Sequence, residues 1–246
     1  MSSLPINQHY MQRALELARQ GLFTTHPNPR VGCVLVKDDK IIAEGWHEKA
    51  GAAHAEINAL KKAGENAKGA TCYVTLEPCC HQGRTGPCIQ ALIDAGVKQV
   101  IAAMRDPNPL VAGKGFAILS ENGIEVEVGL LESEAQELNI GFIKRMQHGL
   151  PFVRAKLAMS LDGRIAMQSG ESQWITGEAA RADGQRLRAR ASAILTGSGT
   201  VLADDPKLNV RLPNFDRQPM RVIIDSQLQT PATAQILQQP GEVLIF

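Results

Sequence analysis

The sequence predicts an α/β protein made of two consecutive domains, and three observations support this expectation. Helical and strand-like segments alternate along the chain, which is typical of layered α/β architecture with a largely parallel sheet. A helix that stops at His148-Gly149 and is followed by Pro151 marks a boundary, so we expect domains at 1–147 and 148–246. With 246 residues, of which 44% are hydrophobic and 21% charged, the chain can bury sizeable cores without disulfides.

The first domain is expected to start with an amphipathic helix, in which Asn7 is the N-cap and Gly21 the C-cap. Two β-rich runs around the polar turn 37–40 then predict a hairpin. The elements expected after the hairpin are a helix at 53–64, a strand at 70–76, a helix at 86–96, a strand at 98–104, a further helix, a strand at 124–128 and a helix at 132–145.

The second domain is expected to begin with a strand just after Pro151. A helix at 179–190 and strands at 192–197, 220–225 and 242–246 should follow. The last of these strands is apolar and no later element covers it, so we expect this domain to be incomplete at its C-terminal end.

Composition and charge exclude several classes of function. The net charge of +1 and the aromatic content of 4% argue against an extended nucleic-acid surface. No apolar run approaches membrane-spanning length, and the first twenty residues lack the apolar region of a signal peptide, so we expect a cytoplasmic protein. In that compartment thiols stay reduced, and clustered cysteines bind metals or act in catalysis more often than they form disulfides.

The stretch EPCCHQGRTGPC, residues 77–88, holds three of the five cysteines. Together with HAE at 54–56 it matches the H-x-E…P-C…C pattern of zinc deaminases. His54, Cys79 and Cys88 would supply three ligands and leave a fourth tetrahedral position for water, as a catalytic zinc site requires. Glu56 would then take a proton from that water and pass it to the substrate.

A closed structural zinc site is the alternative, with Cys80 or His81 as the fourth ligand. Adjacent Cys79 and Cys80 rarely bind the same ion comfortably, and Glu56 would have no role in such a site. The two chosen cysteines are also farther apart than in the usual pattern, so the loop between them must leave the metal and return. That loop contains His81, Gly83, Arg84 and Thr85, which suit a phosphate or a sugar, although Arg84 could equally be a solvated surface charge.

The motifs VTLEPCCHQGRTGPC, HAE and MRDPNPLVAGKG resemble the deaminase domain of the bifunctional riboflavin-biosynthesis deaminase/reductase family. KLAMSLDGRIAMQSGESQWIT and AILTGSGTVLADDPKLNVR resemble the reductase domain of the same family. The resemblance covers nearly the whole chain. It implies a three-layer α/β/α cytidine-deaminase-like domain followed by a dihydrofolate-reductase-like α/β domain. Family members usually carry Ser at the position of Cys80 and Pro at that of Gly86.

The resemblance also implies two reactions on one pyrimidine nucleotide. The first is zinc-dependent hydrolytic deamination of 2,5-diamino-6-ribosylamino-4(3H)-pyrimidinone 5′-phosphate, and the second is NADPH-dependent reduction of its ribosyl group to ribityl. It further implies a homo-oligomer, either a dimer or a tetramer. The family's glycine-rich, dinucleotide-contacting segment has no counterpart in this sequence, which leads us to expect weakened cofactor binding.

The resemblance implies a role for each matching residue. It implies that His54, Cys79 and Cys88 bind zinc and that Glu56 transfers protons. The positions implied to contact the deaminase substrate are Asn28, His47, His81 and Arg84. Those implied to contact the reductase substrate are Lys156, Ser172, Arg188, Leu208 and Arg211, and those implied to contact NADPH are Ala158, Trp174, Thr200, Asp204 and Ser226.

Two functions from other classes compete with this interpretation. A tRNA adenosine deaminase would use the same zinc motif, with the second domain as an RNA-binding appendage, but the charge and the scarce aromatics disfavour it. A non-catalytic zinc scaffold that binds partner proteins would make Glu56 dispensable and would fill the fourth zinc position with a protein ligand.

Overall fold

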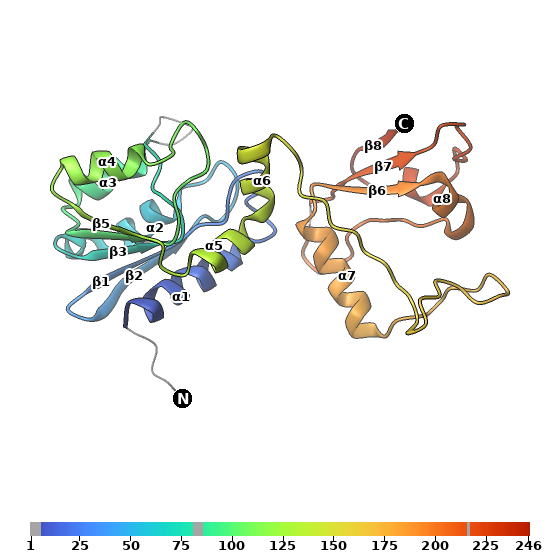
Figure 1. Cartoon of the computed structure of the whole chain (residues 1–246), viewed down its shortest axis with the longest axis horizontal. Coiled ribbons are helices and arrows are strands. Elements are labelled where there is room, and N and C mark those ends of the chain that lie inside the picture. The colour runs from blue at the N-terminus through green and yellow to red at the C-terminus, as the bar shows by residue number, and fades with distance from the viewer. Residues whose placement is uncertain (1–5, 81–85, 216) are drawn as a thin grey trace. The chain divides into compact units, whose positions relative to one another are not determined.

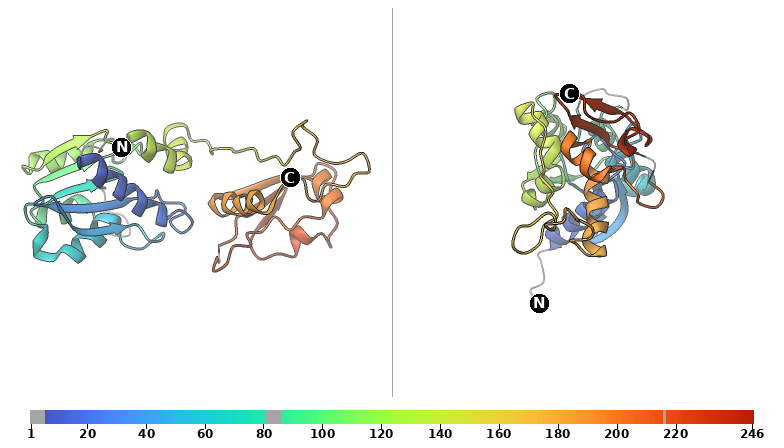
Figure 2. Two further views of the ribbon diagram at one scale, coloured as in Figure 1. Left: turned by 90° about the horizontal axis from the view of Figure 1, so that it is seen from below. Right: turned by 90° about the vertical axis from the view of Figure 1, so that its right-hand side faces the viewer.

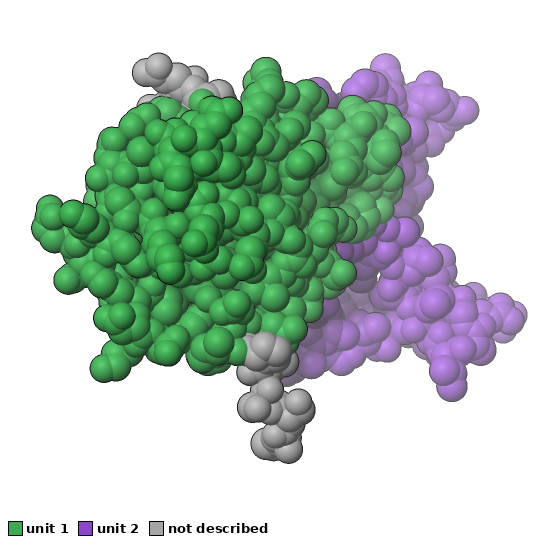
Figure 3. All heavy atoms as spheres, turned by 60° about the vertical axis from the view of Figure 1, so that its left-hand side comes forward, with its two compact units in different colours: residues 1–153 green, residues 154–246 purple. Residues whose placement is uncertain are grey.

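The structure is a computed structural model that describes residues 6–80, 86–215 and 217–246. It divides into two compact units, residues 1–153 and 154–246 (Figure 3), whereas the sequence suggested a boundary after residue 147. No helix in the described part of the chain is long and apolar enough to cross a membrane.

Unit 1 contains a five-stranded sheet in the order β2-β1-β3-β4-β5 (Figure 1). The pairs β1–β2 and β1–β3 are antiparallel, while β3–β4 and β4–β5 are parallel, so this sheet is mixed and not largely parallel as expected. The strands are β1 (Gly32–Lys37), β2 (Lys40–Trp46), β3 (Thr71–Val74), β4 (Gln99–Ala102) and β5 (Glu125–Val128). The predicted hairpin and the predicted strands of this domain therefore all form.

Helices cover both faces of this sheet, which confirms the three-layer α/β/α architecture (Figures 1 and 2). Neighbouring strand residues point to opposite faces: Cys33 and Leu35 belong to one core, and Val34 to the other. The first core packs against α2 (Ala55–Ala63), α3 (Cys88–Asp94) and α4 (Lys114–Glu121), and the second against α1 (Ile6–Gln20) and α5 (Glu132–Leu138).

Two expectations for the helices of unit 1 were wrong. Asn7 lies inside α1 and is not its N-cap; its side chain accepts a hydrogen bond of 2.7 Å from the Tyr73 hydroxyl. The single helix expected at 132–145 is two helices, α5 and α6 (Ile140–His148), which are separated at Asn139. The buried Asn139 side chain accepts a bond from the Arg30 backbone N–H and donates one to the Arg30 carbonyl, and these long-range bonds hold the helix break in place.

Close backbone contact joins α2 to the sheet and thereby positions the segment that begins at His54. A Cβ atom added at Gly45 would lie 2.3 Å from the Ala55 carbonyl oxygen and 2.5 Å from the Ala59 nitrogen. Only glycine allows the helix to approach strand β2 this closely.

We expect Gly45→Ala to lower the free energy of unfolding by about 1–3 kcal/mol or more, because the helix must move away from the strand. Denaturant unfolding of unit 1 measures this change. Gly141→Ala in α6 is the matched control: its new methyl would meet only Phe152 Cβ, 4.0 Å away, so it should be neutral or slightly stabilising. A Gly45→Ala variant as stable as the wild type would contradict this account of the helix–strand contact.

Unit 2 contains a three-stranded parallel sheet in the order β6-β7-β8, with a small core around Val201, Ile223 and Ile236. Its elements are α7 (Glu178–Arg190), β6 (Ala193–Gly197), α8 (Ser198–Asp204), β7 (Met220–Ile224) and β8 (Val243–Ile245). The strand expected just after Pro151 does not form. Residues 151–177 contain neither helix nor strand, because their backbone groups pair with no neighbouring strand.

Candidate metal centre

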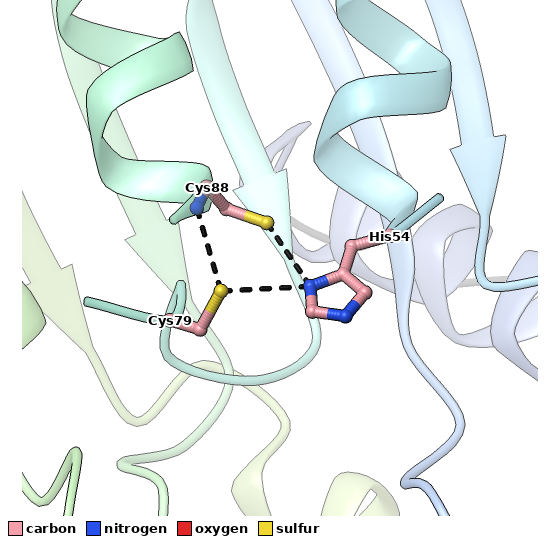
Figure 4. A group of neighbouring side chains, drawn as sticks. All are labelled: His54, Cys79 and Cys88. Carbon is pink, nitrogen blue, oxygen red and sulfur yellow. Dashed lines mark hydrogen bonds between the residues drawn. The ribbon is translucent and has the colours of Figure 1, made fainter. Parts of the chain in front are cut away.

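Three potential ligands come together at the edge of the unit 1 sheet where β3 ends. His54 immediately precedes α2, Cys79 lies in the loop that follows β3, and Cys88 is the first residue of α3. Figure 4 shows the three side chains pointing toward one another. Their ligand atoms all lie within 4.8 Å of one another.

The distances within this group fit a tetrahedral zinc ion. His54 Nδ1 lies 3.2 Å from Cys88 Sγ and 3.5 Å from Cys79 Sγ. Zn–N and Zn–S bonds of about 2.1 and 2.3 Å at a tetrahedral angle place nitrogen and sulfur about 3.6 Å apart. One imidazole nitrogen and two thiolates are also a donor set that zinc prefers. The residues therefore fit zinc with three protein ligands.

Cys79 is poised to bind as a thiolate. The Cys88 thiol and His54 hydrogen-bond to its sulfur, the Cys88 backbone N–H donates to the same sulfur over 3.4 Å, and together they lower the pKa of Cys79 to about 4. Because Cys88 opens α3, the positive end of that helix adds to this preference.

Glu56 occupies the first turn of α2 and is only 3% exposed. Burial is the main cause that raises its pKa to about 7, and the negative charge of Cys79 raises it further. A carboxyl group with a pKa near neutrality can both accept and donate a proton under ordinary conditions. Glu56 lies two residues after His54, and its carboxyl group interacts electrostatically with Cys79, His54 and Cys88.

Asn28 and His47 form a hydrogen-bonded pair beside the candidate ligand His54. The buried His47 ring contacts the His54 ring edge-on, with their centroids 5.3 Å apart. His47 Nδ1 lies 3.1 Å from the Ala53 carbonyl oxygen and must carry the proton, so Nε2 accepts the bond from the Asn28 amide. Burial lowers the pKa of His47, which favours this neutral form.

The other residues considered for this site are Cys80, His81 and Arg84, together with the two remaining cysteines. Cys80 is partly exposed and its thiol faces the Leu110 carbonyl at 3.9 Å, so it lies outside the ligand cluster found among the described residues. His81 and Arg84 fall outside the described residues. Cys33 and Cys72 are fully buried core residues whose sulfurs lie 3.5 Å apart, as expected for small apolar side chains.

Glu77 is a buried carboxylate beside the metal centre for which the sequence predicted no role. It lies two residues before Cys79, is 3% exposed and accepts hydrogen bonds from four backbone N–H groups. A charged residue at the end of an apolar strand, next to a proline, was the only sign of it in the sequence.

In unit 2 the structure brings two of the predicted reductase residues together. Arg188 on α7 donates to the Asn209 backbone carbonyl, and Arg211 donates to the Asn209 side chain over 3.1 Å. Burial, and to a lesser degree the nearby Arg211 charge, lowers the pKa of Arg188. Two guanidinium groups this close, with no acidic residue between them in these contacts, suit an anionic group such as phosphate.

Thr200 and Ser226 lie beyond the carboxyl ends of β6 and β7, which are parallel neighbours. Those ends share one edge of the sheet, where α/β proteins bind nucleotides. The remaining reductase and cofactor positions are spread more widely. Trp174 is 70% exposed beneath the Arg181 guanidinium, Asp204 ends α8, Leu208 packs on the small core, and Lys156, Ala158 and Ser172 lie in the segment without helix or strand.

Fold and site together define the class of protein: a cytidine-deaminase-type zinc domain is followed by a second α/β domain. Residues 5–104 match the family model described as the cytidine and deoxycytidylate deaminase zinc-binding region, and residues 151–246 match the RibD C-terminal domain. The chain belongs to the RibD family, the bifunctional deaminase and reductase of riboflavin biosynthesis. The deaminase domain implies zinc as a cofactor, and the reductase domain implies NADPH.

Similar proteins support this assignment across both domains. The riboflavin biosynthesis protein RibD of Escherichia coli is 58% identical over 96% of this chain, and that of Haemophilus influenzae is 59% identical over 92%. The chain spans 68% and 64% of those two relatives. A solved Acinetobacter baumannii RibD and the deaminase/reductase of Thermotoga maritima each superpose with a TM-score of 0.92, at 57% and 42% identity. Each alignment covers 98% of this chain and 69% of the solved one.

Proposed function

We propose that unit 1 carries out the hydrolytic deamination of 2,5-diamino-6-ribosylamino-4(3H)-pyrimidinone 5′-phosphate. The observation that carries this proposal is the cluster of His54, Cys79 and Cys88 beside the buried carboxylate of Glu56. Three protein ligands leave a tetrahedral ion one position for water, as in catalytic zinc sites. The scaffold interpretation offers no reason for a buried acid at this point.

Zinc, when bound, supplies a water of lowered pKa. The residues of the chain do the rest of the chemistry. Glu56 takes a proton from the attacking water and delivers it to the pyrimidine ring nitrogen, and a second transfer helps ammonia to leave. Burial keeps bulk water away from this carboxylate, so its proton reaches the substrate and not the solvent.

We also propose that Asn28 and His47, with His81 and Arg84, bind the pyrimidine nucleotide. The hydrogen bond from Asn28 and the bond to the Ala53 carbonyl hold the neutral His47 ring in one orientation. A fixed, neutral ring next to His54 suits contact with a heterocycle, whereas Arg84 has the chemistry to pair with its phosphate.

For unit 2 we propose a share in the second step, the NADPH-dependent reduction of the ribosyl group to ribityl. The closeness of Arg188 and Arg211 supports their proposed contact with the substrate phosphate, and Lys156, Ser172 and Leu208 would complete the substrate contacts. Thr200 and Ser226 at one sheet edge support a nucleotide site there, with Ala158, Trp174 and Asp204 as further proposed contacts.

The substrate class is tested by measuring ammonia release from the zinc-loaded 246-residue chain with two substrates. We expect release from the diaminopyrimidine ribonucleotide 5′-phosphate and none above background from a tRNA anticodon stem-loop that carries adenosine. Release from the stem-loop alone would favour the nucleic-acid deaminase, and release from neither substrate would favour the zinc scaffold.

A further inference from the structure

The Glu77 carboxylate makes four hydrogen bonds, all of them to backbone N–H groups. Its Oε2 accepts from Asp106 at 3.1 Å and from Gly113 at 2.9 Å. Its Oε1 accepts from Gly115 at 3.0 Å and from Phe116 at 3.4 Å. Among the described residues it forms no ion pair, so the hydrogen bonds from these N–H groups stabilise its buried negative charge.

These bonds connect two segments that leave the same edge of the sheet. Glu77 follows β3 and lies two residues before the ligand Cys79, while the donors belong to the 105–113 loop and to the first turn of α4. Because β3 and β4 are parallel neighbours, both segments start at the edge where the metal centre lies. Crevices at the carboxyl ends of parallel strands are the usual ligand sites of α/β proteins.

Two further contacts keep the same segments close together. The Cys80 thiol faces the Leu110 carbonyl of the loop, and the Glu77 backbone N–H donates to the Met104 carbonyl at 3.0 Å. A Cβ atom added at Gly115 would lie only 2.5 Å from the Pro78 carbonyl oxygen. The α4 N-terminus therefore packs directly on the backbone that carries the ligand.

We propose that Glu77 is a positioning residue for deamination: its carboxylate holds the 105–113 loop at a fixed distance from Cys79, so that the loop forms one wall of the substrate site. This inference rests on the proposed deaminase function of unit 1. Glu77 acts through the loop and the ligand segment and takes no part in proton transfer.

Glu77→Gln is the sharpest test, because the amide has nearly the same shape but only one acceptor oxygen. Its NH₂ group would face two of the backbone donors, and the loop must shift to relieve the repulsion. We expect kcat/KM for deamination to fall at least ~10-fold while one zinc per chain is retained, since a misplacement of about 1 Å can cost 10²-fold. The d–d absorption of the cobalt-substituted variant should also change.

Leu119→Ala is the control for a purely structural effect. Leu119 is fully buried on the same helix α4, belongs to the first core and donates none of the four hydrogen bonds to the carboxylate. This variant should lose more stability, about 2–5 kcal/mol, yet keep wild-type kcat and KM at temperatures where it is folded.

Glu77→Asp keeps the charge and both oxygens but shortens the tether by one methylene, and it covers the case in which the glutamine variant does not fold. We expect its kcat/KM to lie between those of the wild type and Glu77→Gln. Wild-type kcat and KM in whichever Glu77 variants fold would overturn the proposal. Glu56→Gln in the same assay distinguishes a failure of the proposed deaminase function from a failure of the Glu77 proposal. Full activity of Glu56→Gln refutes the deaminase site itself. An inactive Glu56→Gln together with a fully active Glu77→Gln refutes only the role of Glu77.

Discussion

Glu56→Gln is expected to abolish deamination while it leaves the fold and the zinc in place. General acid–base catalysis by one group typically accelerates a reaction about 10²–10⁴-fold. Because Glu56 serves more than one proton transfer, kcat should fall by about 10²–10⁴-fold or more. The amide should not destabilise unit 1, because a neutral amide costs less to bury than a carboxylate. Ammonia release, zinc content and denaturant unfolding of the same preparation measure the three quantities.

Glu16→Gln provides the matched control for this substitution. Glu16 lies on α1, half-exposed, and pairs only with Arg13 in the contacts the structure describes. It should keep full activity, since α1 covers the face of the sheet opposite α2. A Glu56→Gln variant within about tenfold of the wild type would refute the role of Glu56 in proton transfer.

Cys88→Ser is the second substitution with a large expected effect, in this case on the metal. A serine hydroxyl is a poor donor for a soft site, and its oxygen cannot take the place of a thiolate at the Zn–S distance. Loss of an outer-shell partner already costs 10–100-fold in affinity, so loss of a ligand should cost at least ~100-fold. Competition with a chromophoric chelator measures the zinc affinity.

Cys80→Ser distinguishes the three-ligand site from a closed structural one. Cys80 neighbours Cys79, but its sulfur lies near the Leu110 carbonyl and not among the ligand atoms. Zinc affinity should therefore stay unchanged in this variant. Zinc lost from Cys80→Ser but kept by Cys88→Ser would show that the ligands have been assigned wrongly.

Local patterns were sufficient to predict most of the fold and the three residues that could hold a metal ion. Apolar runs broken by polar turns predict the strands of unit 1, and the rare H-x-E and P-C combination predicts the cluster of His54, Cys79 and Cys88 that the structure brings together. The proposed substrate positions Asn28 and His47 came only from the resemblance, because nothing in their local sequence reveals that the chain brings them beside His54.

Several errors and omissions arose from contacts between distant parts of the chain. The break at Asn139 depends on hydrogen bonds to Arg30, which is 109 residues away in the sequence. The hydrogen bonds to the buried Glu77 carboxylate come from donors 29 to 39 residues further along the chain. The segment after Pro151 has a strand-like pattern, but a strand also requires a partner. The cytoplasmic location and the homo-oligomeric state stay predictions.

Metal removal tests the central claim most directly, namely that zinc held by His54, Cys79 and Cys88 makes unit 1 a deaminase. The measurement is ammonia release from the diaminopyrimidine nucleotide as zinc is titrated back into the chelated, metal-free chain. Activity should be absent at the start, rise linearly and reach a plateau at one zinc per chain, whereas the Glu56→Gln variant should take up the same zinc and remain inactive. Full activity in the metal-free chain would contradict the account. So would activity that reaches its plateau before any zinc has bound to this site.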